Sequence, residues 1–199
     1  MALGLWEPRV RQNLCSSENA CFIDVGAHIG YHTVYVAKRM KKNGLIIAIE
    51  PDKRNQEILC RNISAVGNSH IIVFKGACGP NGFLYLKAKT NPLLNETTAK
   101  ELKDCIKVSS INLDHLANKL ASMGGSFNSI ILKIDVEGGE MEIIRHGLEF
   151  FKKLKPVLIV EASKPRELIK TMWSQGYSSE DLGKSYFIFK PNDPNKASI

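Results

Sequence analysis

Short apolar runs recur along the chain, separated by segments that place apolar residues at helical spacing. The runs are typical of strands buried on both faces of a sheet, and they cover residues 21–25, 45–49, 70–74, 129–134 and 156–160. The segments between them predict helices over residues 30–41, 51–66, 113–120, 141–151 and 165–175. This alternation predicts an α/β fold with a mainly parallel sheet covered on both faces.

The remaining segments are less regular. Residues 82–87 predict a hairpin strand, residues 89–105 a polar loop, and Tyr186–Phe189 a strand that closes the chain. In parallel sheets of this kind, ligands bind at the carboxyl ends of the strands, close to the point where the strand order reverses. We therefore look for functional residues directly after positions 25, 49, 76, 134 and 160.

The composition is that of one globular domain. Of 199 residues, 44% are hydrophobic and 24% charged, which predicts a single domain over 1–199, with a short N-terminal extension over 1–19 and a core over about 20–190. No run approaches the ~20 apolar residues of a membrane-spanning helix. The first residues lack the basic and apolar segments of a secretory signal. We therefore expect a cytoplasmic protein without a membrane partner.

The charge balance is basic, with 27 Lys and Arg against 20 Asp and Glu and a formal net charge of +7. That excess permits an anionic partner, but the basic residues are dispersed, which favours a solvated surface over a nucleic-acid groove. The five cysteines contain no Cys-x-x-Cys pair and predict neither a zinc site nor a disulfide framework. We expect no bound metal.

The first predicted strand runs into the segment Asp24-Val-Gly-Ala-His-Ile-Gly30. A phosphate-binding loop would need Gly-x-x-x-x-Gly-Lys-Ser/Thr, and a dinucleotide fingerprint would need glycines where the chain has His28 and Tyr31. The spacing fits Asp-x-Gly-x-x-x-Gly, the first motif of S-adenosylmethionine-dependent methyltransferases. The residues it predicts to bind this cofactor are Asp24, Gly26, Ala27, His28 and Gly30. The alternative is a tight strand–helix turn without a ligand.

The second predicted strand ends in Ile49-Glu50-Pro51. A carboxylate at this strand end can accept hydrogen bonds from the two hydroxyls of a ribose. Glu50 lies 24 residues beyond Gly26, which suits one crossover helix, so Glu50 and Pro51 are further predicted cofactor residues. The alternative is that Glu50 only caps the helix that follows.

Three acidic residues gather where the strand over 129–134 gives way to a helix, in Lys133-Ile-Asp135-Val-Glu137-Gly-Gly-Glu140. Close carboxylates raise one another's pKa, as a general base requires when a hydroxyl must lose its proton. Asp135 and Glu137 are therefore the predicted catalytic residues. The alternative is helix capping combined with a salt bridge to Lys133.

These segments, together with Ile111-Asn-Leu-Asp114 and Val160-Glu161, resemble the FkbM-type methyltransferases in order and spacing over residues 20–162. The resemblance implies a Rossmann-like class I methyltransferase fold, which is a three-layer α/β/α sandwich with an antiparallel C-terminal strand. It also implies S-adenosylmethionine as donor and methylation of a hydroxyl on a small molecule, often a sugar or secondary metabolite. His28 departs from the family, which usually has Asn there.

Two other functions stay open. A ribose methyltransferase acting on RNA would agree with the net charge, whereas a base-amino methyltransferase would need an Asn/Asp-Pro-Pro-aromatic loop that the chain lacks. A non-catalytic nucleotide-binding module would keep Gly26, Gly30 and Glu50 but has no need of Asp135 and Glu137. A small-molecule hydroxyl acceptor is the favoured partner, nucleic acid is less favoured, and a homo-oligomer is compatible with the sequence.

Overall fold

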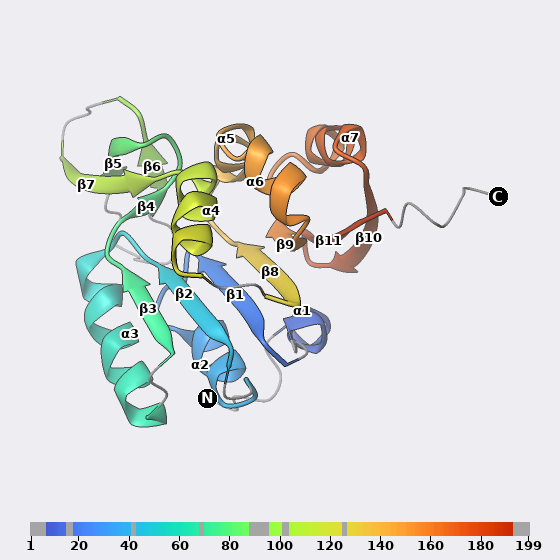
Figure 1. The fold of residues 1–199 in the computed structure, drawn as a ribbon. Coiled ribbons are helices and arrows are strands. Elements are labelled where there is room, and N and C mark those ends of the chain that lie inside the picture. Colours follow the sequence, from blue (N-terminus) through green and yellow to red (C-terminus); the bar gives the residue numbers. More distant parts are fainter. Residues whose placement is uncertain are drawn as a thin grey trace.

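A computed structural model describes residues 7–14, 18–40, 43–67, 70–87, 96–100, 104–124 and 127–192. Its main feature is a seven-stranded sheet in the order β10-β11-β9-β8-β1-β2-β3 (Figure 1). The strands are β1 (Ala20–Val25), β2 (Leu45–Ile49), β3 (Ile71–Phe74), β8 (Ser129–Ile134), β9 (Val157–Glu161), β10 (Tyr177–Gly183) and β11 (Tyr186–Pro191). From β3 to β9 the neighbouring strands are parallel, whereas β11 runs antiparallel to both of its neighbours, β9 and β10.

The chain reverses its direction of travel across the sheet between β1 and β8. From β1 it proceeds to β2 and β3, and after a long insertion it returns to β8 on the other side of β1 and continues to β9 and β11. The carboxyl ends of β1 and β8 therefore form the switch point, where ligands bind in open α/β sheets. The predicted fold class is confirmed, including the antiparallel C-terminal strand.

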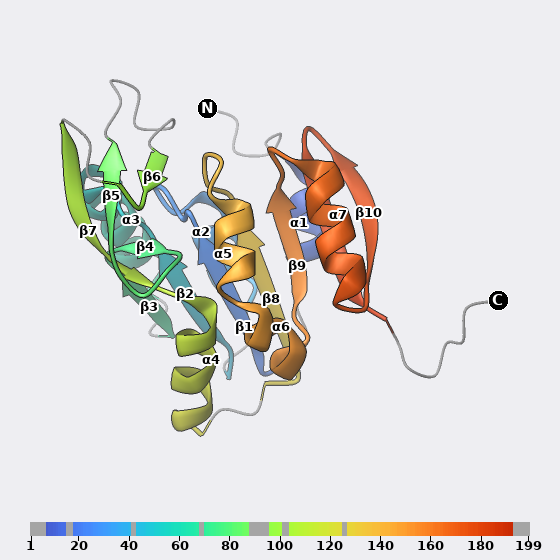
Figure 2. The same cartoon turned by 90° about the horizontal axis from the view of Figure 1, so that it is seen from above.

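Helices cover both faces of the sheet, as Figure 2 shows from above. On one face lie α1 (Pro8–Leu14), α2 (Tyr31–Ala37) and α3 (Lys53–Val66), and on the other α4 (Leu113–Ser122), α5 (Glu140–Arg145), α6 (Leu148–Leu154) and α7 (Pro165–Ser174). Successive residues of a strand point to opposite faces. Thus Phe22 belongs to the core under α1 and α2, and Ile23 to the core under α4 to α7.

A second sheet fills the connection between β3 and α4, in the order β4-β7-β5-β6. Its strands are β4 (Ala77–Cys78), β5 (Gly82–Lys87), β6 (Glu96–Thr98) and β7 (Cys105–Ile111). Figure 1 shows it beyond the carboxyl ends of β2 and β3. The prediction of a loop over 89–105 is wrong at β6, because pairing with β5 forms a strand there that no apolar pattern announces. The strand β7 was not predicted either.

Two predicted helices differ from the structure. The helix predicted over 141–151 is two helices, α5 and α6, which meet at Gly147. A Cβ on Gly147 would lie 2.7 Å from the side chain of Leu113, so α4 packs directly against the break. The helix predicted over 30–41 is shorter, since α2 ends at Ala37. Asn112 caps α4 by accepting a hydrogen bond of 2.7 Å from the His115 N–H.

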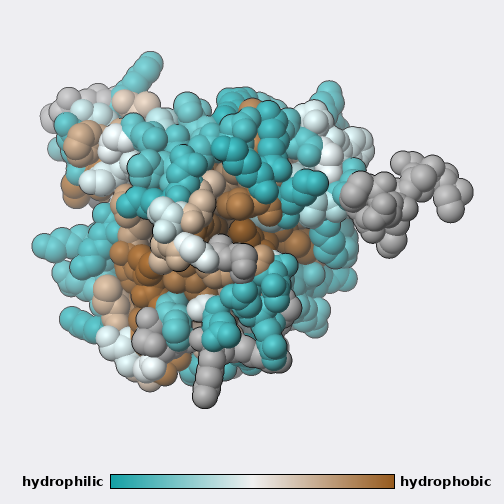
Figure 3. All heavy atoms as spheres, in the orientation of Figure 1, coloured by the Kyte–Doolittle hydropathy of each residue, from teal (hydrophilic) through white to brown (hydrophobic). Residues whose placement is uncertain are grey.

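The face that carries α4 to α7 is partly apolar at its surface, as Figure 3 shows near the middle of the molecule. A cavity of about 430 Å³ lies between α4, α6 and the first residues of β8 and β9, lined by residues that include Leu120, Phe127, Ile130, Leu154 and Val157. It lies at the amino ends of these strands, opposite the edge where the predicted site residues gather. No helix in the described part of the chain is long and apolar enough to cross a membrane.

Candidate active site

The backbones of two loops lie against each other at the switch point. The Asp135 N–H donates to the Val25 carbonyl at 3.0 Å, which extends the pairing of β1 and β8 by one residue. Gly26 has φ +77°, and a Cβ there would lie 1.9 Å from the Asp135 carbonyl oxygen. Gly30 has φ +87°, and a Cβ there would lie 2.6 Å from the Leu59 side chain. Only glycine fits at Gly26 and Gly30 without rearrangement.

Glu50 has the position and the spare capacity expected of a cofactor ligand. Its side chain is buried, and it accepts hydrogen bonds from the N–H groups of His28 (2.8 Å, on Oε2) and Asp52 (2.9 Å, on Oε1). Asn55 Nδ2 donates to Oε1 at 3.3 Å. A carboxylate offers about four acceptor positions, so one position on Oε2 is unused. That geometry suits one ribose hydroxyl, whereas the second would have to displace Asn55.

The alternative that Glu50 only caps the following helix does not hold, because Asp52 is the cap of α3. The N-cap of α3 is Asp52, whose carboxylate accepts hydrogen bonds from the N–H groups of Arg54 and Asn55. Burial raises the pKa of Glu50, and the hydrogen bonds from Asp52, His28 and Asn55 oppose that rise. Pro51 lies half-buried between the two acids. Glu50 is thus held in place by the protein without serving as a helix cap.

Ala27 and His28 complete the turn between β1 and α2. Ala27 is buried, and its N–H donates a hydrogen bond of 3.0 Å to the Ile49 carbonyl. His28 has φ +53°, in the left-handed region where Asn and His are enriched among non-glycine residues. The departure from Asn to His is therefore compatible with the backbone at this position. Burial is the main cause that lowers the pKa of His28.

Asp24 and Lys133 form a buried ion pair one strand apart. They are direct partners in the register of β1 and β8, with Asp24 Oδ1 at 3.3 Å from Lys133 Nζ and both side chains at most 1% exposed. Asp24 Oδ2 accepts a hydrogen bond of 2.7 Å from Thr33 Oγ1. Asp24 thus links β1 to α2 through the hydrogen bond from Thr33 and to β8 through the ion pair with Lys133. Its predicted contact with the cofactor stays a prediction.

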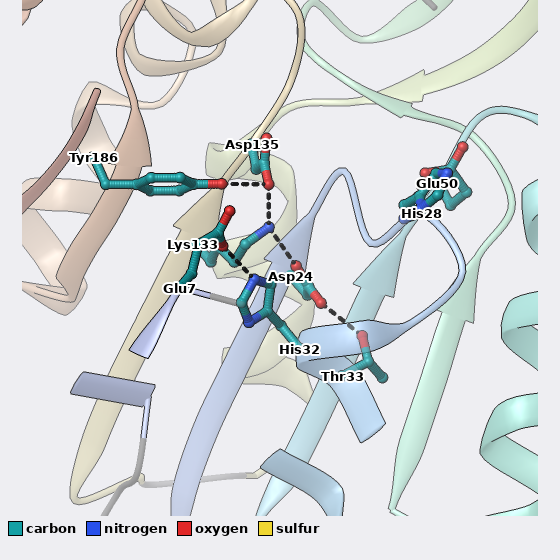
Figure 4. A network of polar contacts seen from close by, with 9 residues as sticks. All are labelled: Glu7, Asp24, His28, His32, Thr33, Glu50, Lys133, Asp135 and Tyr186. Carbon is teal, nitrogen blue, oxygen red and sulfur yellow. Dashed lines mark hydrogen bonds and ion pairs between the residues drawn. The ribbon is translucent and has the colours of Figure 1, made fainter. Parts of the chain in front are cut away.

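Lys133 also contacts Asp135, at 3.1 Å from Nζ to Oδ2. Burial alone would lower the pKa of Lys133, but the carboxylates of Asp135 and Asp24 outweigh it and raise the pKa. The ammonium therefore stays charged, as the salt-bridge interpretation of this lysine expects. Figure 4 shows the chain of contacts from Thr33 through Asp24 and Lys133 to Asp135.

Tyr186, which the sequence did not identify as a site residue, completes this chain of contacts. It is the first residue of β11 and the register partner of Glu161 on β9. Its hydroxyl donates a hydrogen bond of 2.8 Å to Asp135 Oδ2. Burial and the charge of Asp135 raise the pKa of Tyr186, so the hydroxyl keeps its proton and remains a donor.

Asp135 follows β8 and Glu161 ends the neighbouring strand β9, and each carboxyl group influences the pKa of the other. Burial opposes ionisation of Asp135, but Lys133 and the hydrogen bonds from Glu161 and Tyr186 prevail and lower its pKa to about 2. Burial, the bond to Asp135 and nearby carboxylates raise the pKa of Glu161 to about 8. The two shifts have opposite signs, so Glu161 holds a proton more readily than Asp135 does.

A second polar pair comes from outside the predicted core. Glu7 Oε2 lies 3.0 Å from His32 Nε2, and both side chains are nearly buried. Glu7 is also one of the carboxylates whose charge raises the pKa of Glu161. It belongs to the extension predicted over 1–19, and no local motif marks it. Figure 4 shows the contact between Glu7 and His32.

The other two acids of the 133–140 segment lie apart from this cluster. Glu137 is exposed in the turn after β8, where its charge also raises the pKa of Glu161. Glu140 is buried and accepts hydrogen bonds from both the N–H and the hydroxyl of Ser163, which ties α5 to the loop after β9. Of the two predicted catalytic residues, the structure brings Asp135 into the cluster and leaves Glu137 at its edge.

Comparison with known proteins decides the family. Residues 24–179 match the methyltransferase FkbM domain. The chain belongs to the FkbM methyltransferase family. The matched range contains Glu50, Asp135 and Glu161, so these residues of the candidate site lie within the FkbM domain, whereas Glu7 precedes it.

Individual relatives agree with this assignment. Methyltransferase 1 of Beauveria bassiana (strain ARSEF 2860) is 28% identical over 153 residues, covering 66% of this chain and 59% of that protein. The FkbM methyltransferase of Methylobacillus flagellatus KT superimposes with a TM-score of 0.63 at 17% identity, over 94% of this chain and 47% of that one. A precorrin-6y C5,15-methyltransferase from Geobacter metallireducens GS-15 gives 0.54 at 14% identity, over 94% and 87%. The chain thus spans only about half the length of the first two of these relatives, and the structural likenesses show the class I methyltransferase fold.

Proposed function

We propose that this FkbM-family protein transfers a methyl group from S-adenosylmethionine to a hydroxyl oxygen of a small molecule, such as a sugar or secondary metabolite. The observation that carries the proposal is the placement of two acidic residues at the carboxyl edge of the sheet, Asp135 directly after β8 and Glu161 at the end of β9. An alcohol becomes an effective nucleophile only when a base accepts its proton. Carboxyl groups at the cofactor crevice are suited to that task, whereas a nucleotide-binding module would not need them.

The residues of the candidate site would have different roles in this reaction. S-adenosylmethionine, when bound, supplies a methyl group already activated on a sulfonium. Glu50 would accept a hydrogen bond from a ribose hydroxyl through its unused position on Oε2. The glycines at 26 and 30 let the turn after β1 pass close to β8 and α3, which fixes that turn. The remaining task of the protein is to align the acceptor and exclude water.

The charges near Glu161 favour a neutral or cationic acceptor. Carboxylates of Glu7, Asp135 and Glu137 act on this residue, and the nearby ammonium of Lys133 is paired with Asp24 and Asp135. A phosphate placed here would meet like charges at short range. This arrangement supports a small hydroxyl compound over the ribose of an RNA, despite the net charge of +7.

Two measurements test the proposal. Calorimetry should show that S-adenosylmethionine and S-adenosylhomocysteine bind and that NAD does not. Transfer of a labelled methyl group should then be measured with polyols and sugars, amines, and RNA as acceptors, and the product should be an O-methyl ether. Binding of NAD alone contradicts the donor, and methylation confined to amines or RNA contradicts the acceptor class.

A further inference from the structure

An apolar cavity lies at the amino ends of β8 and β9, on the edge of the sheet opposite the candidate active site. Its volume is about 430 Å³, within the range of about 300–1,000 Å³ that small-molecule sites occupy. Apolar side chains supply most of its walls, namely Leu120 and Ala121 of α4, Phe127 and Ile130 near the start of β8, Leu154 of α6 and Val157 of β9. Figure 3 shows apolar surface near the middle of this face. The cavity therefore offers the contacts that a hydrocarbon chain requires.

Two lysines give the cavity a positive charge. Lys153 in the last turn of α6 and Lys155 directly after that helix line the cavity, and no acidic side chain does so among the described residues. Neither lysine forms an ion pair in the part of the chain that the structure describes. Glu149, which interacts electrostatically with Lys153, is already paired with Lys152 at 2.9 Å. Two exposed ammonium groups thus lack an anionic partner beside an apolar cavity.

The backbone at Lys155 is a second indication that its charge has a use. Lys155 has φ +42° and ψ +53°, the left-handed conformation, and its N–H donates a hydrogen bond of 3.1 Å to the Phe151 carbonyl. Glycine or asparagine is favoured at such a helix end, because other side chains are strained there. The dipole of α6 favours a cation at this end, but Lys152 and Lys153 already supply one. A ligand that uses its charge explains a strained lysine at this position.

We propose that this cavity binds a free medium-chain carboxylate, with its hydrocarbon chain against the apolar walls and its head group at Lys153 and Lys155. Burial of the chain would provide most of the affinity, and the two ammonium groups would select an anionic head. Their charge exceeds the partial negative charge of about half an elementary charge at the end of α6. The cavity lies at the start of β8, whereas Asp135 follows its end, so the carboxylate should not compete with S-adenosylmethionine.

Calorimetry and amide NMR titrations of the whole chain with decanoate, below its micelle concentration, test the site. Decanoate should bind saturably, decanol more weakly and decyltrimethylammonium most weakly, because the three share a chain and differ in charge. Butyrate should not bind measurably, since its chain is too short to fill the cavity. The amide shifts should lie in α4, α6 and the first residues of β8, and they should persist with saturating S-adenosylhomocysteine.

Substitutions can distinguish recognition of the head group from burial of the chain. Lys153→Gln combined with Lys155→Gln should weaken decanoate binding about tenfold, the upper range for two exposed ion pairs, and leave decanol unchanged. The exposed Lys170→Gln on α7 is the control and should bind as wild type. Ala121→Phe fills part of the cavity from an exposed position on α4, so it should weaken decanoate and decanol alike.

Several results would overturn the inference. Absence of saturable decanoate binding contradicts it, as does equal binding of decanoate and decyltrimethylammonium. Unchanged affinity in the double lysine variant, or amide shifts confined to the turns at Gly26 and Glu50, also contradicts it. None of these results bears on methyl transfer, because binding of decanoate needs neither methyl donor nor acceptor. Conversely, failure to methylate any hydroxyl would leave the carboxylate site unaffected.

Discussion

The hydroxyl of Tyr186, on the antiparallel strand β11, lies 2.8 Å from the carboxylate of Asp135, which follows the parallel strand β8. The two residues are 51 positions apart in sequence. They meet because β9 lies between their strands and pairs with both. The C-terminal hairpin therefore reaches the candidate site through one side chain.

Removing the Tyr186 hydroxyl tests the strength of this contact. Tyr186→Phe should lower the free energy of unfolding by about 1.5–3 kcal/mol, because hydrogen bonds to charged groups have this range. Tyr177→Phe is the matched control, since Tyr177 is equally buried but donates a long bond of 3.4 Å to the neutral carbonyl of Phe151. It should cost about 0.5–1.5 kcal/mol or less. Equal losses in urea denaturation would contradict a charged partner for Tyr186.

Alanine substitutions at two glycines with nearly the same backbone conformation can distinguish the cost of backbone strain from the cost of a steric clash. Gly26 and Gly138 have φ +77° and +76°, but only at Gly26 would a Cβ meet another atom within 4 Å. Gly138→Ala should cost about 1–2 kcal/mol, the penalty of the left-handed conformation. Gly26→Ala should cost several kcal/mol more and weaken S-adenosylhomocysteine binding. Similar denaturation midpoints for the two variants would show that the turn rearranges at little cost to relieve the clash with Asp135.

Replacing Lys133 tests the buried charge network. Lys133→Met leaves the carboxylates of Asp24 and Asp135 without their cation, and breaking a buried pair costs about 3–5 kcal/mol. The loss should shrink as pH falls, because protonation of the two carboxyl groups relieves the unpaired charge. Chemical denaturation at pH 5 and pH 8 measures both effects. A loss that does not vary with pH would contradict this explanation.

The raised pKa of Glu161 should make the free energy of unfolding depend on pH. Its pKa is about 8 in the folded protein against an ordinary value of 4.5, so the folded state binds the proton more tightly. Unfolding releases that proton between these values, and the free energy of unfolding should fall as pH rises from about 4.5 to 8. Asp135 acts in the opposite sense, because its lowered pKa adds stability that is lost as pH falls toward 2. Glu161→Gln should remove the slope above pH 4.5, whereas the exposed control Glu180→Gln should keep it.

Glu50 should contribute to cofactor binding through its free acceptor position. Glu50→Gln should weaken S-adenosylhomocysteine binding by about 1.5–3 kcal/mol, the range for hydrogen bonds to a charged acceptor. The exposed Glu57 on α3 provides the control, Glu57→Gln, which should bind as wild type. Calorimetry measures both. An affinity within twofold of wild type in Glu50→Gln would limit Glu50 to holding the turn.

The sequence predicted the parts of the fold that local patterns encode. Apolar runs located the parallel strands, and Gly26, Glu50 and Asp135 lie directly after three of them, as the sequence predicted. The strand β7 escaped prediction because its residues are mostly exposed or half-buried and show no continuous apolar run. The break at Gly147 depends on contact with Leu113, which only the folded chain provides.

The candidate site also contains residues that the sequence indicated and residues that it did not. Asp135 and Lys133 were identified from one motif, since both lie at the end of one buried strand. Tyr186 was placed in a closing strand by its apolar neighbours, but its register against Glu161 could not be inferred from the sequence. Glu7 enters from a segment before the first strand, and nothing in its neighbourhood indicates a site. Residues brought in by tertiary contact were therefore the ones that sequence reasoning missed.

The direct pairing of Asp24 with Lys133 bears on how the sheet assembles. These residues are 109 positions apart, and the strands that carry them are otherwise apolar, so hydrophobicity alone discriminates poorly among their alignments. A shift of one residue would move Lys133 to the opposite face and bury two separated charges. The ion pair thus penalises misaligned intermediates, and its loss should appear as slower or heterogeneous refolding.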